Sequence, residues 1–258
     1  MRQVVHNQLV YYQFPQWAEL KHGIFTRKGG TSQTPWDSLN VGGTLGDDVE
    51  AVHKNHALMY EALNVNSKRA CTVWMVHGNE VVLVNDPVNG RRWIAKADAM
   101  ITHKLDTPLV MRYADCTPIM FFDRVKQVIG IAHAGWRGTV KGIGARTVQA
   151  MVQAYGSKPS DIEAGIGPCI GPDRYQVGEE VVSAIQDHYG TTDELIRRDP
   201  ADGTAYLNLW RANELDLERA GVEKIYISGI CTAENTNEFY SHRAEKGKTG
   251  RFGTIISL

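Results

Sequence analysis

The sequence predicts a mixed α/β (α+β) fold in which β-sheets are flanked by helices. Two observations support this prediction. Strand-like and helix-like segments both recur along the chain, and they do not follow the strict strand–helix–strand alternation of a doubly wound parallel sheet. No internal repeat, low-complexity tract or Pro/Ser-rich linker divides the 258 residues, so we expect one catalytic domain over residues 1–258.

Seven segments are predicted as strands because each is short, rich in β-branched or aromatic residues, and bounded by turn-forming residues. In chain order these strands cover residues 81–85, 109–113, 119–122, 128–132, 162–166, 224–228 and 254–257. Their number and spacing indicate one or more mixed sheets rather than a helical bundle.

Four segments are predicted as helices because bulky residues recur at steps of three and four. The first follows Asp47 and Asp48, whose carboxylates suit the N-terminal turn of a helix. Its predicted buried face carries Val49, Val52, His56, Met59 and Leu63. The others cover residues 140–155, 178–189 and 207–220, and the last ends before Gly221, a residue type that commonly follows a helix C-terminus.

The charge balance and the cysteines exclude several classes of protein. The chain has 28 Lys and Arg against 29 Asp and Glu, so we expect no dedicated nucleic-acid or acidic-membrane surface. No stretch is apolar enough to span a bilayer, and we find no export or transit signal. The four cysteines form no CxxC pair, which favours reduced thiols and a cytoplasmic location.

Residues 113–138 contain the densest group of chemically active side chains. Two strands here are joined by a short polar turn, which predicts a hairpin. Pairing Phe122 with Gln127 would close this turn. In that register Cys116 faces His133, with their Cβ atoms roughly 5 Å apart. A thiolate and an imidazole at that distance can share one metal ion or one proton. The alternative is that Cys116 is a buried small side chain and His133 a hydrogen-bonded histidine at the end of a strand.

His77 is the third candidate ligand. Two imidazoles and one thiolate can bind zinc and leave a fourth position for water or substrate. We therefore predict one zinc ion per chain on His77, Cys116 and His133, with copper as the less favoured metal. A bound zinc ion would lower the pKa of its water toward about 7. The spacing of the three residues matches no short zinc-finger pattern, and the other histidines are competing ligands.

Further candidates for proton transfer or substrate binding are Asp115, Arg27, Ser32, Asn40, Arg243 and Arg251. Asp115 either moves protons or, as a structural aspartate, binds loop backbone or orients a ligand histidine. Arg27 and Ser32 flank two glycines in a segment that either cradles phosphate or forms an ordinary turn. Asn40 either recognises a base or binds backbone. The two later arginines either close an anion site or are solvated.

Eight short motifs occur in order along most of the chain. They are TRKGGTS at 26–32, SLNVG at 38–42, VHG at 76–78, ADAMIT at 97–102, ADCTP at 114–118, HAGWRG at 133–138, GIGPCIG at 165–171, and CT…FYSHR…GR from 231 to 251. By this ordered set the sequence resembles the laccase-domain family, also called multicopper polyphenol oxidase-like or peptidoglycan editing factor proteins, whose members are described as purine nucleoside phosphorylases.

The resemblance implies a function for these motifs. The family's metal ligands fall on His77, Cys116 and His133. The family implies zinc, phosphorolysis of adenosine, inosine, guanosine or methylthioadenosine, and deamination of adenosine to inosine. It also implies a fold related to bacterial toxin deamidases that use a Cys–His pair. Two positions depart from the family pattern: Met75 replaces a common Gln, and His56 replaces a common Arg.

We therefore predict a zinc-dependent purine nucleoside phosphorylase and adenosine deaminase whose partners are a purine nucleoside and phosphate. In this hypothesis Asp115 moves protons, and Arg27, Ser32 and Arg243 hold phosphate. A second hypothesis is a metal-free hydrolase or amidase of envelope metabolism, with Cys116 as the nucleophile. A copper-dependent polyphenol oxidase and a non-catalytic binding protein are the remaining alternatives. The oligomeric state stays open.

Overall fold

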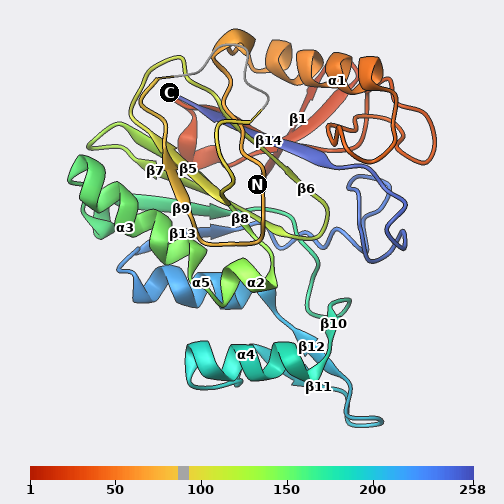
Figure 1. Cartoon of the computed structure of the whole chain (residues 1–258), viewed down its shortest axis with the longest axis vertical. Coiled ribbons are helices and arrows are strands. Elements are labelled where there is room, and N and C mark those ends of the chain that lie inside the picture. The colour runs from red at the N-terminus through yellow and green to blue at the C-terminus, as the bar shows by residue number, and fades with distance from the viewer. Residues whose placement is uncertain (87–92) are drawn as a thin grey trace.

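The computed structural model describes residues 1–86 and 93–258, and two sheets pack against each other between layers of helix (Figure 1). The five-stranded sheet has the order β1 (Arg2–His6), β2 (Leu9–Gln13), β3 (Lys21–Phe25), β14 (Phe252–Ser257) and β6 (Leu109–Tyr113). The six-stranded sheet has the order β13 (Lys224–Ile227), β9 (Ile162–Ile166), β7 (Thr117–Asp123), β8 (Val128–Ala134), β5 (Ala99–Thr102) and β4 (Val81–Leu83). Because this sheet contains parallel and antiparallel pairs, the predicted mixed α/β class is confirmed.

The two central strands of the larger sheet are buried on both faces, which explains their nearly continuous apolar sequence. In β7, Met120 and Phe122 face the core between the sheets, whereas Ile119 and Phe121 face the helices outside. The outer helices are α3 (Ile143–Tyr155) and α5 (Leu209–Arg219). On the opposite side of the molecule α1 (Val49–Ala62) covers the five-stranded sheet (Figure 1).

Three predicted helices agree with the structure to within two residues, and one is wrong at its start. The first is capped as expected, because the Asp48 side chain accepts a hydrogen bond from the backbone N–H of Glu50 at 3.1 Å. The segment predicted as 140–155 is helical only from Ile143, as α3, and a separate short helix, α2 (Trp136–Thr139), precedes it. Gly142 separates them with a left-handed φ of 69°, a conformation that glycine adopts without steric cost.

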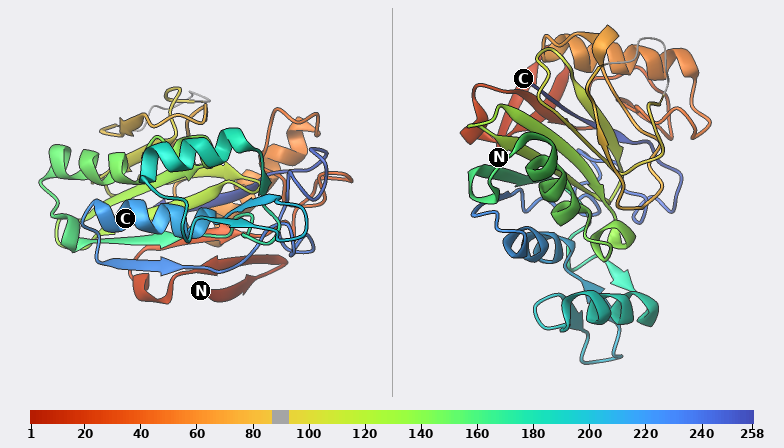
Figure 2. Two further views of the ribbon diagram at one scale, coloured as in Figure 1. Left: turned by 90° about the horizontal axis from the view of Figure 1, so that it is seen from below. Right: turned by 60° about the vertical axis from the view of Figure 1, so that its left-hand side comes forward.

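Several strands escaped prediction. Strands β1 to β3 form an antiparallel group on one side of the five-stranded sheet, and polar residues at most of their exposed positions dilute the apolar pattern. The strands β10 (Gln176–Val177), β11 (Ile196–Arg198) and β12 (Ala205–Leu207) are too short to show a period. These three lie with α4 (Glu179–Tyr189) at one end of the molecule (Figure 2, right). Short 3-10 helices cover Pro15–Trp17, Ser67–Arg69 and Pro159–Asp161.

The predicted register of the β7–β8 hairpin is wrong by two residues. Asp123 pairs with Val128, and Pro118 rather than Cys116 lies opposite His133. Side chains alternate between the faces of a strand with a period of two, so this shift leaves Cys116 on the predicted face. The predicted proximity of Cys116 and His133 therefore survives the error.

The side chain of Asp123 explains the shifted register. Its Oδ1 accepts hydrogen bonds from the backbone N–H groups of Val125 and Lys126, both at 2.9 Å. These bonds extend the strand through Asp123 and start the turn one residue later than predicted. Gln127 ends the turn with a left-handed φ of 52°. An aspartate that binds backbone two and three residues later is a common turn device, but the sequence alone did not distinguish it from a loop residue.

His22 in β3 makes the stability of the fold depend on pH. Its Nδ1 donates to the carbonyl of Leu20, and its Nε2 accepts from the backbone N–H of Phe14 at 2.9 Å. Burial lowers the pKa of His22 to about 4. Because the unfolded chain takes up this proton near pH 6.5, the free energy of unfolding is expected to fall by on the order of 3 kcal/mol as the pH drops from about 6.5 to about 4.

Denaturant titrations at pH 7 and pH 4.5 test this prediction. His22→Gln is expected to weaken the dependence of stability on pH, even if it lowers stability at pH 7. His6→Gln in the neighbouring strand β1 is the control and should keep the wild-type dependence. An unchanged pH dependence in His22→Gln would contradict the assignment.

No helix of the described residues is long and apolar enough to cross a membrane.

Candidate metal centre

Three of the predicted site residues meet at one end of the six-stranded sheet. Cys116 directly precedes β7, His133 lies near the end of β8, and His77 lies in the loop before β4. Because β7 and β8 are antiparallel, the start of one strand and the end of the other share an edge. One ligand atom from each of the three side chains lies within 4.8 Å of the others. The two imidazole rings are 5.0 Å apart between centroids and nearly perpendicular.

A buried carboxylate organises this group. Asp98 precedes β5, and its Oδ1 accepts hydrogen bonds from Nδ1 of His133 at 2.9 Å and from the backbone N–H of His77 at 3.0 Å. Its Oδ2 accepts from the backbone N–H groups of Val76 and Gly78 at 3.1 and 2.7 Å. One fully buried side chain thus fixes the His133 ring and the loop that carries His77. The bond to Nδ1 leaves Nε2 of His133 available as a ligand.

The backbone near the three side chains is shaped to keep space between them. A Cβ atom on Gly135 would lie 2.8 Å from Sγ of Cys116 and 3.2 Å from Cδ2 of His77, so a larger residue would enter the space between these two side chains. His77 and Asp115 adopt left-handed φ values of 57° and 80°. Residues other than glycine adopt such values at a steric cost, and they cluster at functional sites.

The environment favours the thiolate form of Cys116 beside a protonated His133, which would give up its proton on binding a metal. Burial raises the pKa of the Cys116 thiol, but the charge of His133 and hydrogen bonds with both histidines lower it to about 6. Burial lowers the pKa of His133, whereas Cys116 and Asp98 raise it to about 9. The site therefore stabilises a thiolate, the form in which cysteine binds metal. Two imidazoles, one thiolate and a carboxylate behind one imidazole fit zinc.

The three side chains line a cavity of about 430 Å³ that is rich in arginine. The arginines of its wall are Arg112, Arg137, Arg243 and Arg251. Two of them lie over aromatic rings of the same wall: Arg137 over Trp136 at 4.2 Å, and Arg243 over Tyr175 at 5.2 Å from the ring centroid. Such a concentration of guanidinium groups suits an anion such as phosphate.

Arg27, Ser32 and Asn40 lie behind this cavity rather than in its wall. Arg27 pairs with Glu245 at 2.9 Å, and Glu245 also accepts from the backbone N–H of Ser241. Oδ1 of Asn40 accepts from the backbone N–H of Arg251 at 2.8 Å. Ser32 accepts from the side chain of Asn55. Arg27 and Asn40 therefore support the loop that carries Arg243 and Arg251, whereas Ser32 contacts α1.

Asp115 lines the cavity but its carboxylate is engaged by protein groups. Oδ1 accepts from the hydroxyl of Thr232 at 2.7 Å, and Oδ2 accepts from the backbone N–H of Arg243 at 2.6 Å. These bonds agree with the structural alternative for Asp115, because they tie the Arg243 loop to the segment before β7 that carries Cys116.

Sequence reasoning missed Asp98, Arg112 and Arg137. The signal for Asp98 was an acidic residue between two alanines at the start of an apolar strand, a position where an unpaired carboxylate would be costly. Arg112 is the one charged residue of the otherwise apolar strand β6, and its sequence position carried no signal of a cavity. The two departures from the family pattern fall at different places: Met75 lines the metal cavity, and His56 lines a neighbouring one.

The fold and the site together define a mixed α/β protein with a candidate His/Cys/His metal site in an arginine-rich cavity. A model of the multi-copper polyphenol oxidoreductase laccase family matches residues 21–258, and the chain belongs to this family.

Related proteins are named after a different activity from the one in the description of the family model. "Purine nucleoside phosphorylase YlmD" of Bacillus subtilis is 35% identical over 248 residues, 93% of this chain and 89% of that protein. A purine nucleoside phosphorylase of Deinococcus radiodurans is 37% identical over 237 residues, 92% of this chain and 88% of that protein. The crystal structure of YlmD from Geobacillus stearothermophilus matches with a TM-score of 0.91 and 34% identity, covering 99% of this chain and 97% of that one.

Proposed function

We propose that this protein is a zinc-dependent purine nucleoside phosphorylase that acts on adenosine, inosine, guanosine or methylthioadenosine and also deaminates adenosine. The observation that carries the proposal is that a His/Cys/His group and four arginines line the same cavity. The names of the related proteins support the substrate class. The free cysteines fit a reducing compartment, so a cytoplasmic location is part of the proposal.

In this proposal His77, Cys116 and His133 hold the zinc ion, which when bound supplies a Lewis acid to the cavity. Phosphorolysis forms a bond between a phosphate oxygen and C1′ of the ribose and breaks the bond from C1′ to the purine nitrogen, and the purine leaves with a proton. The arginines bind and orient phosphate, because planar guanidinium groups match its oxygens. Asp115 positions Arg243 through its backbone N–H.

Arg251→Gln tests the phosphate role. The Arg251 side chain is held by bonds from Nη1 to the carbonyls of Thr249 and Gly250, so its direction is fixed before substrate binds. We expect the KM for phosphate to rise about tenfold or more, because a charge-assisted bond is lost, while the bound metal stays. Arg197→Gln, which removes an exposed arginine paired with Asp173 outside the cavity, is the matched control. An unchanged phosphate KM in Arg251→Gln would remove this residue from the phosphate site.

A metal-free Cys–His hydrolase is a second candidate, and one observation favours it. Cys116, His133 and Asp98 form a chain of thiol, imidazole and carboxylate, the order of a nucleophile, its base and the group that orients the base. The lowered pKa of Cys116 fits a nucleophile as well as a ligand. His77 distinguishes the two candidates, because a metal needs its imidazole and the Cys–His–Asp chain does not.

A copper oxidase of phenols is the least supported alternative. Multicopper oxidation needs several histidine-rich sites. Within residues 1–86 and 93–258, the one group of three or more potential ligands is His77, Cys116 and His133.

A further inference from the structure

Cleavage of a nucleoside needs a proton donor at the purine. When the bond from C1′ to the purine nitrogen breaks, the electron pair stays on the purine, and a proton on N7 makes the purine a neutral leaving group. The donor must line the cavity and exchange its proton near neutral pH, which excludes the arginines. Among the described residues of the cavity wall, the other side chains that can carry a proton are those of His77, Tyr113, Asp115, Cys116, His133, Tyr175 and His242.

The reactive side chains at the floor of the cavity are engaged in other contacts. His77, Cys116 and His133 are the candidate metal ligands, so their ligand atoms face the metal rather than a purine. Both carboxylate oxygens of Asp115 accept hydrogen bonds from protein groups, one of them the backbone N–H of Arg243. The carboxylate of Asp115 therefore presents no donor to a ligand.

The two tyrosines of the wall are too weakly acidic to transfer a proton near pH 7. The hydroxyl of Tyr113 donates to the carbonyl of Ala132 at 3.0 Å, and burial raises its pKa well above the usual range. Burial also raises the pKa of Tyr175 well above the usual range. Both groups keep their protons under conditions in which a general acid must release one.

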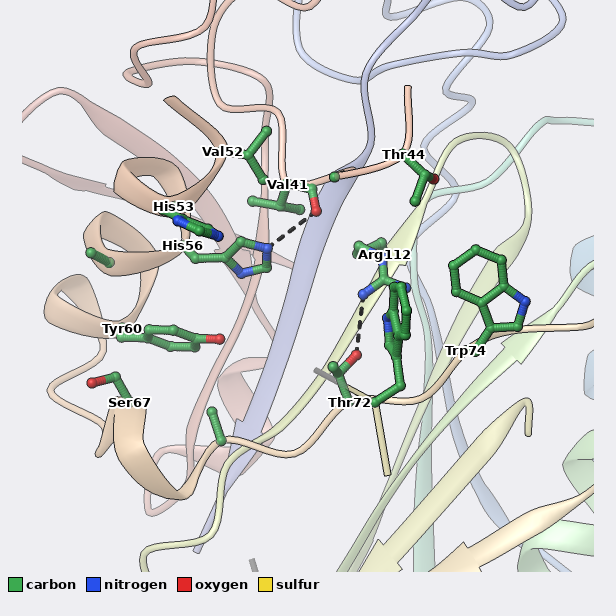
Figure 3. A pocket seen from close by; sticks show the side chains of 14 residues that line it. Val41, Thr44, Val52, His53, His56, Tyr60, Ser67, Thr72, Trp74 and Arg112 are labelled. Carbon is green, nitrogen blue, oxygen red and sulfur yellow. Dashed lines mark hydrogen bonds between the residues drawn. The ribbon is translucent and has the colours of Figure 1, made fainter. Parts of the chain in front are cut away.

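The histidines of the neighbouring cavity are also unsuited to this role. His53 and His56 lie on α1, across that cavity from Arg112, the residue that it shares with the metal cavity (Figure 3). Nε2 of His56 donates to the carbonyl of Val41 at 3.2 Å (Figure 3). Burial and the charge of Arg112 lower the pKa of His56 to about 4. At pH 7 this imidazole is neutral and has no acidic proton to transfer.

His242 is the remaining candidate, and its side chain is available to a ligand. The residue is exposed and lines the metal cavity. Within residues 1–86 and 93–258, neither nitrogen of its ring has a hydrogen-bond partner. The ring packs over Gly247, where a Cβ atom would lie only 3.3 Å from Cε1, so the glycine leaves room for it. Histidine is the most common general acid and base in enzymes, because it exchanges its proton near neutral pH.

The backbone of His242 is fixed although its side chain is exposed. Its carbonyl accepts a hydrogen bond from the N–H of Gly247 at 2.8 Å, which closes the turn that carries it. The N–H of the next residue, Arg243, donates to Asp115 at 2.6 Å. Because Asp115 directly precedes Cys116, these bonds hold His242 in a set position relative to the metal centre.

We propose that His242 is the general acid of nucleoside cleavage and that its imidazolium donates a proton to N7 of the purine as the bond to C1′ breaks. This inference rests on the proposed function. A phosphate oxygen forms the new bond to C1′, and the proton from His242 neutralises the electron pair that the purine takes. The phosphate then releases its own proton, which restores the imidazolium through solvent, so the protons balance.

This assignment places the purine inside the metal cavity, close to the metal centre. The wall of that cavity contains the apolar side chains of Met75, Ile170 and Leu209 beside its charged groups. Its volume of about 430 Å³ is within the range of small-molecule sites. Both proposed reactions, cleavage at C1′ and deamination of the base, then take place in one cavity.

The dependence of His242→Gln on the leaving group tests the inference. In 7-methylguanosine a methyl group occupies N7, so its purine leaves as a neutral molecule without a proton from the enzyme. General acid catalysis contributes about 10²–10⁴-fold to a rate. We therefore expect kcat for guanosine to fall about 100-fold or more and kcat for 7-methylguanosine to fall far less, with the zinc content unchanged. His103→Gln, at an exposed histidine outside both cavities, is the matched control and should keep both rates.

A second variant, His242→Ala, is measured with imidazole added to the buffer. Because the position is exposed, free imidazole can reach it and supply the missing proton, and we expect kcat for guanosine to rise with imidazole concentration. If wild type does not accept 7-methylguanosine, this rescue decides the inference: a rise supports it and no rise overturns it.

The outcomes separate the inference from the function on which it rests. If wild type cleaves guanosine and His242→Gln keeps the wild-type kcat, the inference is overturned and the function stands. An equal fall for guanosine and 7-methylguanosine also overturns it, because a merely structural role would affect both substrates alike. Zinc-loaded wild type that cleaves neither substrate overturns the function and the inference together.

Discussion

Replacing Asp98 with Asn is expected to lower zinc affinity about 10- to 100-fold, the usual effect of losing a carboxylate behind a ligand histidine. The carboxylate accepts hydrogen bonds from His133 and from three backbone N–H groups of the His77 loop. An amide has one acceptor oxygen, and its NH2 group would face donors. The variant therefore loses both the orientation of one ligand and the anchor of another. Leaving buried donors unpaired is also expected to lower the free energy of unfolding by roughly 3 kcal/mol.

Asp123→Asn is the matched control for this prediction. Asp123 is also fully buried and also accepts from backbone N–H groups, but it does so in the hairpin turn at the opposite end of β7. We expect it to lose stability and to keep its zinc. The measurements are metal content after dialysis against a chelator and thermal unfolding of each variant. Zinc affinity equal to wild type in Asp98→Asn would show that the carboxylate does not act on the metal site.

Replacing His77 is expected to remove the bound metal and purine cleavage together, with zinc affinity lowered by more than the roughly 100-fold seen for groups behind a ligand. The backbone of His77 is left-handed, and Asn adopts this conformation at a lower steric cost than Ala. His77→Asn is therefore the main variant, and His77→Ala is measured beside it. His103→Asn, at an exposed histidine outside both cavities, is the control and should keep metal and activity.

The same variant decides between the two candidate functions. Cys116, His133 and Asp98 remain in His77→Asn, so a metal-free hydrolase would keep its activity and its reactive thiol. Hydrolysis of amide substrates by metal-free wild type and by His77→Asn alike would support the hydrolase. Loss of zinc with loss of purine cleavage would support the phosphorylase.

Much of the fold was predictable because its central strands and its helices are strongly patterned. Five of the six strands of the larger sheet were predicted as short apolar runs, whereas β5 was missed, and α1, α4 and α5 agree with their predicted ranges to within two residues. Strands β1 to β3 were not predicted from their composition, and β3 is held in the sheet by pairing with β14 at the far end of the sequence. The break before α3 depends on one glycine conformation that a periodicity argument does not see.

The reactive residues of the candidate site were predictable, but the residues that hold them in position were not. Cys116 and His133 were placed together by strand alternation, and His77 was added by ligand chemistry. Asp98 lies at the start of a different strand, and its contacts depend on long-range sheet order. The glycine-containing segment with Arg27 has the composition of an anion-binding loop, but folding places it against the loop of Glu245, where its cation is neutralised. Local sequence does not determine which loops meet.

The most direct test of the central claim is chromatographic analysis of the products of adenosine in phosphate buffer, with zinc-loaded wild type and His77→Asn side by side. We predict adenine and ribose 1-phosphate from wild type, inosine where deamination also occurs, and neither from the variant. Intact adenosine with folded, zinc-loaded wild type, or equal product from the metal-free variant, would contradict a zinc-dependent purine nucleoside phosphorylase.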